Sequence, residues 1–593
     1  MLAELDRAIA STQAHLLSLR NEQGHWEGEL SSSALSTATA VVALKLVDAV
    51  KHAAFIEKGA AWLRQHQNTD GGWGDTTISK SNLSTTLLCW SALHLVGMSS
   101  PAAEAWIIAR TGSLAPEAIA KAVIARYGKD KTFSVPILML CSLCGTLGEK
   151  PWRNVIALPF ELAALPRTWF GAVGLPVVSY ALPALIAIGH IRFQKAPPAW
   201  WNPLRWLRAL AWKRVRPMLQ TLQPSSGGYL EATPLTSFVT MALAGAGDLD
   251  HPCLPLAVEF LRRSMRADGA WPIDTNLATW GTTLSVRACS SGFSPSDENG
   301  LKPELRTWLL AQQYRDVHPF TNAAPGGWAW TDLPGGVPDA DDTSSALIAL
   351  HQLTAPEFRH SSFDIRHSAQ AAIRWLLDLQ NRDGGIPTFC RGWGALPFDR
   401  STPEITAHAL LAWWTWKVEL PEELQTRIET ATGRALAYLK KNQAADGSWL
   451  PLWFGNEHTP DEMNPVYGIA QVLNHLGGHA DLSARAAALI QTGLRYLRAA
   501  QKPDGSFGGD PSSPASIEET AVALHALALS DPSPSALRPS LDWLLKATRE
   551  GTHFPSAPIG LYFARLWYHE RLYPVIWTLQ ALKSARQGLS ESE

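Results

Sequence analysis

Three carboxylates within four residues are the feature of this sequence that most directly indicates chemistry. Asp339, Asp341 and Asp342 follow Trp328 and Trp330 and precede an apolar stretch that predicts a helix. Like charges this close cannot all be ionised, so at least one carboxyl keeps its proton near neutral pH. A neutral acid beside indole rings suggests proton donation to an apolar group, with the rings stabilising the cation that forms.

The same residues also have simpler explanations. Gly335, Gly336 and Pro338 predict a turn before the helix, and Asp342 or Thr343 is then predicted to cap the helix. A capped acidic turn, or a carboxylate site for a divalent cation, accounts for the three acids without catalysis. The acids by themselves therefore leave these alternatives open.

Composition limits the classes of protein to consider. With 593 residues the chain exceeds one ordinary core, which predicts two domains. A net charge of -2 gives no electrostatic case for binding nucleic acid. The 6 cysteines are scattered through apolar stretches, which favours core packing in a reducing cytoplasm over zinc binding or disulfides. The 26 tryptophans indicate both a repeated packing motif and an aromatic-lined cavity. The first residues do not resemble a signal peptide.

A unit made of a helix ending in Gln, an Asp-Gly turn and, in most copies, an aromatic residue recurs along the chain. Its apolar positions have helical spacing, its glycine suits positive φ, and its Gln can bond the backbone freed at the helix end. A helix with one apolar face must bury it, so repeated helical hairpins predict an all-α protein whose hairpins stack or close into a ring. The clearest copies cover 58–73, 372–385, 435–449 and 493–507, and weaker copies end at Tyr229, Trp271 and Trp328.

A second polar pair lies downstream of the acids. Glu404 and His408 are four residues apart and follow Ser401-Thr402-Pro403, which predicts that they share one face of a helix starting there. By itself such a pair is more often a surface hydrogen bond than a catalytic contact.

The stretch 326–343, in which Gly-Gly-Trp-Ala-Trp precedes Asp-Ala-Asp-Asp-Thr, resembles the protonating motif of squalene-hopene cyclases and other class II terpene cyclases. The repeated units resemble the QW repeats of triterpene cyclases, and the resemblance extends over nearly the whole chain. It implies two α/α barrels, one inserted after the first helix of the other. Residues 1–20 with 285–593 are expected to form the catalytic barrel, and 21–284 the inserted barrel.

The resemblance also assigns roles to the polar residues. It makes Asp341 the proton donor and His408 its hydrogen-bond partner, with Asp339, Asp342 and Glu404 around them. A positively charged His408 is expected to stabilise the carboxylate that remains after proton transfer. Neither a metal nor another cofactor is expected for this chemistry.

Aromatic rings are expected to line the cavity, because their faces attract a carbocation and offer no good nucleophile. Residues 278–284 resemble a cavity segment of the family, and 561–574 resemble its aromatic terminal segment. The candidates are Trp280, Trp328, Trp330, Phe389, Trp453, Tyr562, Phe563 and Trp567.

Three stretches depart from the family pattern. Where squalene cyclases have a cavity tryptophan in the inserted barrel, the match falls near Val173. Residues 36–39, Ser-Thr-Ala-Thr, stand where squalene cyclases have acids, which leaves the termination step and the product open. Arg391 follows Phe389 and Cys390 where the family has an acid. Arg391 is a candidate for pairing with Asp399 or for contacting a substrate phosphate.

Residues 195–219 mix tryptophans with basic residues, a combination that suits the membrane interface. Their position matches the family's membrane-dipping region, whereas a basic helix that covers its own barrel is the simpler alternative. The resemblance therefore predicts a peripheral or monotopic protein at the cytoplasmic face of a membrane, with a homodimer as one compatible assembly.

The sequence as a whole favours a class II terpene cyclase that protonates a terminal isoprene double bond. Squalene is the first expected substrate, with a hopene-like polycyclic triterpene as product. The first alternative is farnesyl or geranylgeranyl diphosphate, cyclised to a bicyclic product that retains its diphosphate. Two other classes stay as alternatives: a zinc prenyltransferase β-subunit, which shares the α/α barrel but requires Asp, Cys and His ligands, and a helical-repeat scaffold without catalysis.

Overall fold

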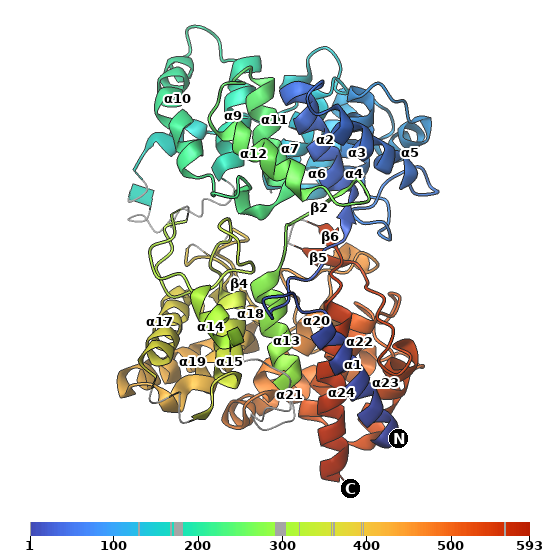
Figure 1. The fold of residues 1–593 in the computed structure, drawn as a ribbon, viewed down its shortest axis with the longest axis vertical. Coiled ribbons are helices and arrows are strands. Elements are labelled where there is room, and N and C mark those ends of the chain that lie inside the picture. Colours follow the sequence, from blue (N-terminus) through green and yellow to red (C-terminus); the bar gives the residue numbers. More distant parts are fainter. Residues whose placement is uncertain are drawn as a thin grey trace.

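The protein is helical and consists of two lobes, drawn one above the other in Figure 1. The computed structural model describes residues 2–128, 131–166, 169–170, 182–290, 304–319, 321–356, 359, 362–392, 394, 396–561 and 565–592. The helices of the upper lobe are α2 (Ala34–Asp48), α3 (Ala53–Gln65), α4 (Leu83–Leu95), α5 (Pro101–Thr111), α6 (Pro116–Tyr127), α7 (Lys131–Leu143), η1 (Pro151–Arg153), η2 (Phe160–Ala164), α9 (Leu182–Lys195), α10 (Pro203–Thr221), η4 (Tyr229–Glu231), α11 (Thr233–Gly245) and α12 (Cys253–Ser264).

The lower lobe contains the first helix and every helix after α12. Its helices are α1 (Leu2–Ser18), α13 (Ala278–Ser290), α14 (Glu304–Ala311), α15 (Ala340–Gln352), α17 (Phe363–Leu379), α18 (Pro403–Trp416), η6 (Lys417–Glu419), α19 (Glu422–Asn442), η7 (Pro460–Glu462), α20 (Pro465–Gly477), α21 (Ala480–Ala500), α22 (Ile517–Ser530), α23 (Pro534–Ala547) and α24 (Tyr573–Ser592). Short antiparallel pairs join β1 (Ser32–Ser33) to β2 (Trp271–Pro272), β3 (Ile386–Pro387) to β4 (Ser401–Thr402), and β5 (Ile559–Leu561) to β6 (Leu566–Tyr568).

The lower lobe is a closed ring of inner helices. Along the ring, α13, α15, α18, α20, α22 and α24 each pack against the next, and α24 returns to α13. Among these helices, α18 and α22 are buried on nearly every face, which explains why their sequences are apolar on almost every side. Outside them, α17, α19, α21 and α23 are amphipathic and bury one face only. An α/α barrel results, with its site-bearing helices inside.

The upper lobe closes in the same way, since α2, α4, α7, α9 and α11 follow one another and α11 packs back on α2. Helix α1 packs on α24 of the lower lobe, so the upper barrel is inserted after the first helix. The all-α fold with two barrels is as the sequence predicts. The predicted boundary at residue 285 falls inside α13, which begins at Ala278. None of the helices in the described ranges combines the length and apolar character needed to cross a membrane.

The repeated Gln and aromatic residues close the ends of outer helices. In the first copy, Gln67 Nε2 donates to Gly71 O at 2.7 Å, and the indole Nε1 of Trp73 donates to Leu63 O at 2.8 Å. The Gln and aromatic residues of the copies at 435–449 and at Tyr229 make the same kinds of bond. Gly71 has a φ of 89°, a conformation that favours glycine. These three copies therefore satisfy polar groups that a buried helix end would otherwise leave without partners.

Buried carboxylates of the upper lobe accept backbone N–H groups of the lower lobe. Asp75 Oδ2 accepts the N–H of Trp567 at 2.8 Å, and Glu231 Oε1 accepts the N–H of Gly335 at 2.8 Å. Gly335 lies in the turn that leads to the three acids, so the second bond fixes the approach to α15.

Candidate active site

The N-terminus of α15 holds the three acids. Asp339 is the capping residue, because its Oδ1 accepts the backbone N–H groups of Asp341 and Asp342, each at 2.9 Å. The prediction that Asp342 or Thr343 caps this helix is therefore wrong. Asp339 has extended backbone and can turn its carboxyl onto the first helical turn, whereas Asp342 and Thr343 already lie within that turn.

Asp341 and His408 are in direct contact. Helix α18 starts at Pro403 after the cap Thr402, as the sequence predicts, and it carries His408 into the ring interior. There His408 Nδ1 lies 2.6 Å from Asp341 Oδ1, the contact that the family resemblance implies. Glu404 lies on the same helix, but its Oε1 accepts the backbone N–H of Leu452 at 2.8 Å.

The other ring nitrogen of His408 faces an arginine. Arg287 of α13 is buried, and its Nη1 lies 2.8 Å from His408 Nε2. Burial, together with the positive charge of Arg287, holds the pKa of His408 well below its ordinary value. The expectation of a positively charged His408 is therefore wrong, because a guanidinium already occupies the position that a second imidazole proton would need.

Burial keeps protons on the carboxyl groups. It raises the pKa of Asp341 to about 7, against the opposing effect of the Arg287 charge. The pKa of Asp339 is likewise raised to about 7 by burial, and that of Asp342 lies well above its ordinary value because of burial and the neighbouring Asp339 charge. Burial also raises the pKa of Glu404 to about 7. The site can therefore hold a neutral carboxylic acid near neutral pH.

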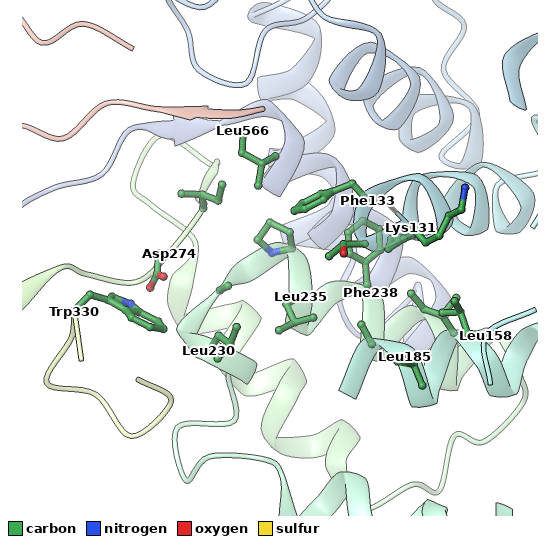
Figure 2. A pocket seen from close by; sticks show the side chains of 17 residues that line it. Lys131, Phe133, Leu158, Leu185, Leu230, Leu235, Phe238, Asp274, Trp330 and Leu566 are labelled. Carbon is green, nitrogen blue, oxygen red and sulfur yellow. The ribbon is translucent and has the colours of Figure 1, made fainter. Parts of the chain in front are cut away.

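The acids open into a largely apolar cavity of about 100 Å³. Asp341, with 22% of its side chain accessible, lines this cavity. A second cavity of about 260 Å³ adjoins it, and Asp274 and Trp330 line both. Figure 2 shows the larger cavity with Trp330 and Asp274 at one end and Lys131 toward the other. Its remaining lining consists mostly of aliphatic and phenylalanine side chains, so together the cavities accommodate a long apolar chain.

The predicted aromatic residues divide into two groups. Trp280, Trp330, Phe389 and Trp453 line the cavity with the acids, and the rings of Phe389 and Trp453 meet edge to face with centroids 5.9 Å apart.

Trp328 and Trp567 are fully or almost fully buried and do not line either cavity. The indole of Trp328 instead closes the repeat, with Nε1 donating to Leu309 O at 2.8 Å. Tyr562 and Phe563 lie outside the described residues. Arg391 is exposed and belongs to neither cavity lining.

Several residues of the site were missed in the sequence. Tyr568 and Tyr573 line the cavity with the acids, and Trp280 Nε1 donates to the hydroxyl of Tyr573 at 3.1 Å. Asp274 is buried between the two cavities, and burial with the nearby Glu231 charge holds its pKa well above its ordinary value.

Three of the missed residues had a usable signal. Arg287 is the single charged residue of α13 and lies seven positions after Trp280, on the same helix face. Tyr568 and Tyr573 both fall within the aromatic terminal segment 561–574. Among the described residues, no group of three or more His, Cys, Asp or Glu side chains is arranged to hold a metal ion.

Comparison with known families places the chain among cyclases. Residues 9–181 match the squalene-hopene cyclase N-terminal domain, and 277–526 match the squalene-hopene cyclase C-terminal domain. The terpene cyclase-glycosyl transferase fusion protein fsoA of Humicola fuscoatra is 25% identical over 94% of this chain and 48% of its own length. The chain thus spans about half the length of that relative.

Two further relatives differ in the substrate that their names indicate. The squalene-hopene cyclase of Alicyclobacillus acidocaldarius is 25% identical over 80% of this chain and 78% of its own length. The drimenyl diphosphate synthase of Streptantibioticus cattleyicolor is 28% identical over 51% of this chain and 52% of its own length. In fold, the chain is similar to the ent-copalyl diphosphate synthase of Streptomyces platensis, with a TM-score of 0.53, 18% identity, and coverage of 98% of this chain and 99% of that one.

Proposed function

Because the chain belongs to the squalene-hopene cyclase-like family of class II terpene cyclases, we propose that Asp341 protonates a terminal isoprene double bond and starts cyclisation of a linear polyprene. The observation that carries this proposal is a carboxyl with a pKa raised to about 7 at the end of an apolar cavity. Protonating an isolated alkene requires an acid that is neutral at rest and whose conjugate base is stabilised once the proton leaves.

The geometry supports both requirements, a donor that is neutral at rest and a conjugate base that is stabilised. The proton of Asp341 passes to the alkene carbon, and the carboxylate that remains is held by His408 and by the N-terminal end of α15, where the helix dipole favours negative charge. The cation formed on the substrate faces the rings of Trp280, Trp330, Phe389 and Trp453, whose π faces attract it.

Squalene is the substrate that we propose first. One relative is a squalene-hopene cyclase, and most of the side chains that line the larger cavity are apolar. Squalene carries no polar group, so a largely apolar cavity can receive it without burying a charge that has no partner.

A prenyl diphosphate is the second candidate, and Lys131 is the observation that favours it. Lys131 lies at the N-terminus of α7 and lines the larger cavity away from the acids, with Nζ donating to Gly128 O at 3.2 Å. A cation at that end suits the anionic head of a chain whose other end meets Asp341. Incubation of the purified protein with squalene, geranylgeranyl diphosphate and farnesyl diphosphate, with products identified by mass spectrometry, distinguishes the two candidates. If none of the three is cyclised, the proposed function is wrong.

The rate of cyclisation is expected to fall as pH rises through the pKa of the donor. Burial raises the pKa of Asp341 to about 7, and the donor must be protonated to act. Activity is therefore present below pH 7 and lost above it, by about tenfold for each further pH unit. The measurement is kcat/KM between pH 5 and 9 on a substrate without ionisable groups. A rate that stays level or rises up to pH 9 would contradict a carboxylic acid donor.

We also propose that α10 and the segment before it attach the protein to the cytoplasmic face of a membrane. Trp200, Trp201 and Trp206 are exposed by 70%, 72% and 69%, and Leu207 and Leu210 beside them are also exposed. The surfaces of soluble proteins rarely expose so many large apolar side chains together. Indole rings with neighbouring basic residues, by contrast, suit the head-group region of a lipid membrane. Such a position gives an insoluble substrate a direct route to the protein.

Replacing Trp201 and Trp206 by Ser is expected to weaken binding to anionic lipid vesicles by about tenfold or more, because two interfacial indoles are lost. Sedimentation with vesicles containing phosphatidylglycerol measures the effect. Phe363→Ser, at an exposed position on α17 of the other lobe, serves as the matched control and should leave binding unchanged. Equal binding by all variants would exclude α10 as the attachment surface.

A further inference from the structure

A buried arginine contacts the ring nitrogen of His408 that does not face Asp341. Arg287 lies on α13, is 8% exposed, and lines a small chamber of about 30 Å³ together with Asp341, Glu404 and His408. Its Nη1 is 2.8 Å from His408 Nε2, while His408 Nδ1 is 2.6 Å from Asp341 Oδ1. The three side chains therefore form one line from α13 through α18 to α15.

The two contacts of His408 allow only one placement of the protons on its ring and on Asp341. Arginine has donors and no acceptor, so His408 Nε2 must accept and cannot carry a hydrogen. A neutral imidazole has one N–H, which must then be on Nδ1 and must donate to Asp341 Oδ1. Since Asp341 Oδ1 accepts this bond, a neutral Asp341 carries its acidic proton on Oδ2. That oxygen is the one left available for the substrate.

We propose that Arg287 is a positioning residue of the catalytic acid: it holds the ring proton of His408 on Nδ1 and supplies, through that ring, the positive charge that stabilises the Asp341 carboxylate after proton transfer. The inference rests on the proposed role of Asp341 as donor. In this arrangement the Arg287 guanidinium provides the positive charge that a protonated His408 would otherwise provide. Arg287 remains charged across the working pH range, because burial lowers its pKa only to about 10.

The other ionisable groups around the pair do not supply this charge. On α15 and α18 the neighbours are the carboxyls Asp339, Asp342 and Glu404, all with pKa values raised by burial.

On α20, Tyr467 is buried and His475 stacks on His408 with ring centroids 4.1 Å apart, and burial holds the pKa of His475 well below its ordinary value. On α22, burial lowers the pKa of His525 to about 3. Among the described residues that line the chamber, Arg287 is thus the group that carries a permanent positive charge.

The test compares Arg287→Met with the wild-type protein on whichever substrate the wild type cyclises. We expect kcat to fall roughly 100-fold, because the preorganised positive charge is lost. KM should change by less than about 3-fold, because the side chains that line the substrate cavity are unchanged. The alkaline limb of the pH profile is expected to move to higher pH, since the charge of Arg287 lowers the pKa of Asp341. Arg287→Lys, which restores a charged donor, should recover at least about a tenth of the wild-type rate.

A double variant separates positioning from a general structural effect. If Arg287 acts through His408, then Arg287→Met combined with His408→Ala should be no slower than His408→Ala alone. Losses that multiply, or an Arg287→Met enzyme with the wild-type rate and pH profile, would overturn the inference.

Should Arg287→Met fail to fold, Arg287→Lys and Arg287→Gln provide the same test. A rate for Lys at least about tenfold above that for Gln supports the positioning role, and equal rates contradict it. A wild-type protein that cyclises none of the substrates would instead reject the proposed function itself, so the two failures are distinguishable.

Discussion

Asp341→Asn is expected to abolish cyclisation, lowering kcat by at least about 10³-fold, because an amide of the same shape has no acidic proton to give to an alkene. The substitution keeps the polar contact to His408 and the position in the first turn of α15, so the fold should be retained. Product formation measured by mass spectrometry, with circular dichroism as the check on folding, gives the result.

The matched control for this prediction is Asp378→Asn. Asp378 lies in the same lobe with 70% of its side chain exposed, and replacing it should leave kcat unchanged. If Asp341→Asn retains more than about a tenth of the wild-type rate, another group donates the proton. Asp342, whose pKa lies well above its ordinary value and which lines the same cavity, would then be the next residue to test.

Trp328→Ala is expected to destabilise the lower barrel by about 3 to 5 kcal/mol, the cost of removing a buried tryptophan and leaving a cavity. Trp328 is 0% exposed, its backbone N–H donates to Thr343 Oγ1 at 2.9 Å, and its indole donates to Leu309 O at 2.8 Å. It therefore ties the segment before the acids to α14 and to the first turn of α15. Urea unfolding followed by tryptophan fluorescence or circular dichroism measures the loss.

Two further variants divide this effect into its parts. Trp328→Phe keeps most of the apolar area but loses the indole N–H, so it should cost about 1 to 3 kcal/mol, the penalty for leaving Leu309 O without its donor. Trp330→Ala, two residues later and half-buried on the cavity wall, should cost less stability and change the distribution of products instead. A Trp328→Ala protein as stable as the wild type would show that the repeat aromatic does not hold the barrel together.

The sequence predicted the fold well because the repeats encode it locally. A Gln at a helix end, a turn glycine and an aromatic residue within about twenty positions specify one helical hairpin. The repeats left stacking and ring closure both open, and the two barrels were implied by the family resemblance. The contact between Asp341 and His408 was implied by the resemblance to the cyclase family, whereas local signals predicted only where the two helices start. What the residues alone predicted correctly thus rests on spacing within a helix or turn.

The errors arose where the outcome depended on a third element. A charged His408 was a reasonable expectation until α13 brought Arg287 against its other nitrogen. Trp328 and Trp330 are equivalent by composition, and an extended segment would turn both to the same side. The chain instead bends at Trp330, so Trp328 closes the repeat and Trp330 lines the cavity. Neither distinction can be read from one stretch of sequence.

The packing of α1 on α24 has a consequence for the order in which the protein can assemble. Asp6 of α1 pairs with Arg586 of α24 at 2.8 Å, and Ser11 donates to Gly551 O at 3.0 Å. During translation the segments of the upper barrel emerge before the helices that complete the lower ring, so the upper barrel can fold while α1 still waits with Leu5, Ala8 and Leu16 uncovered. Helix α1 thus leaves the ribosome before both barrels but is among the last of these helices to be buried, and the nascent chain must keep it from aggregating until α24 is synthesised.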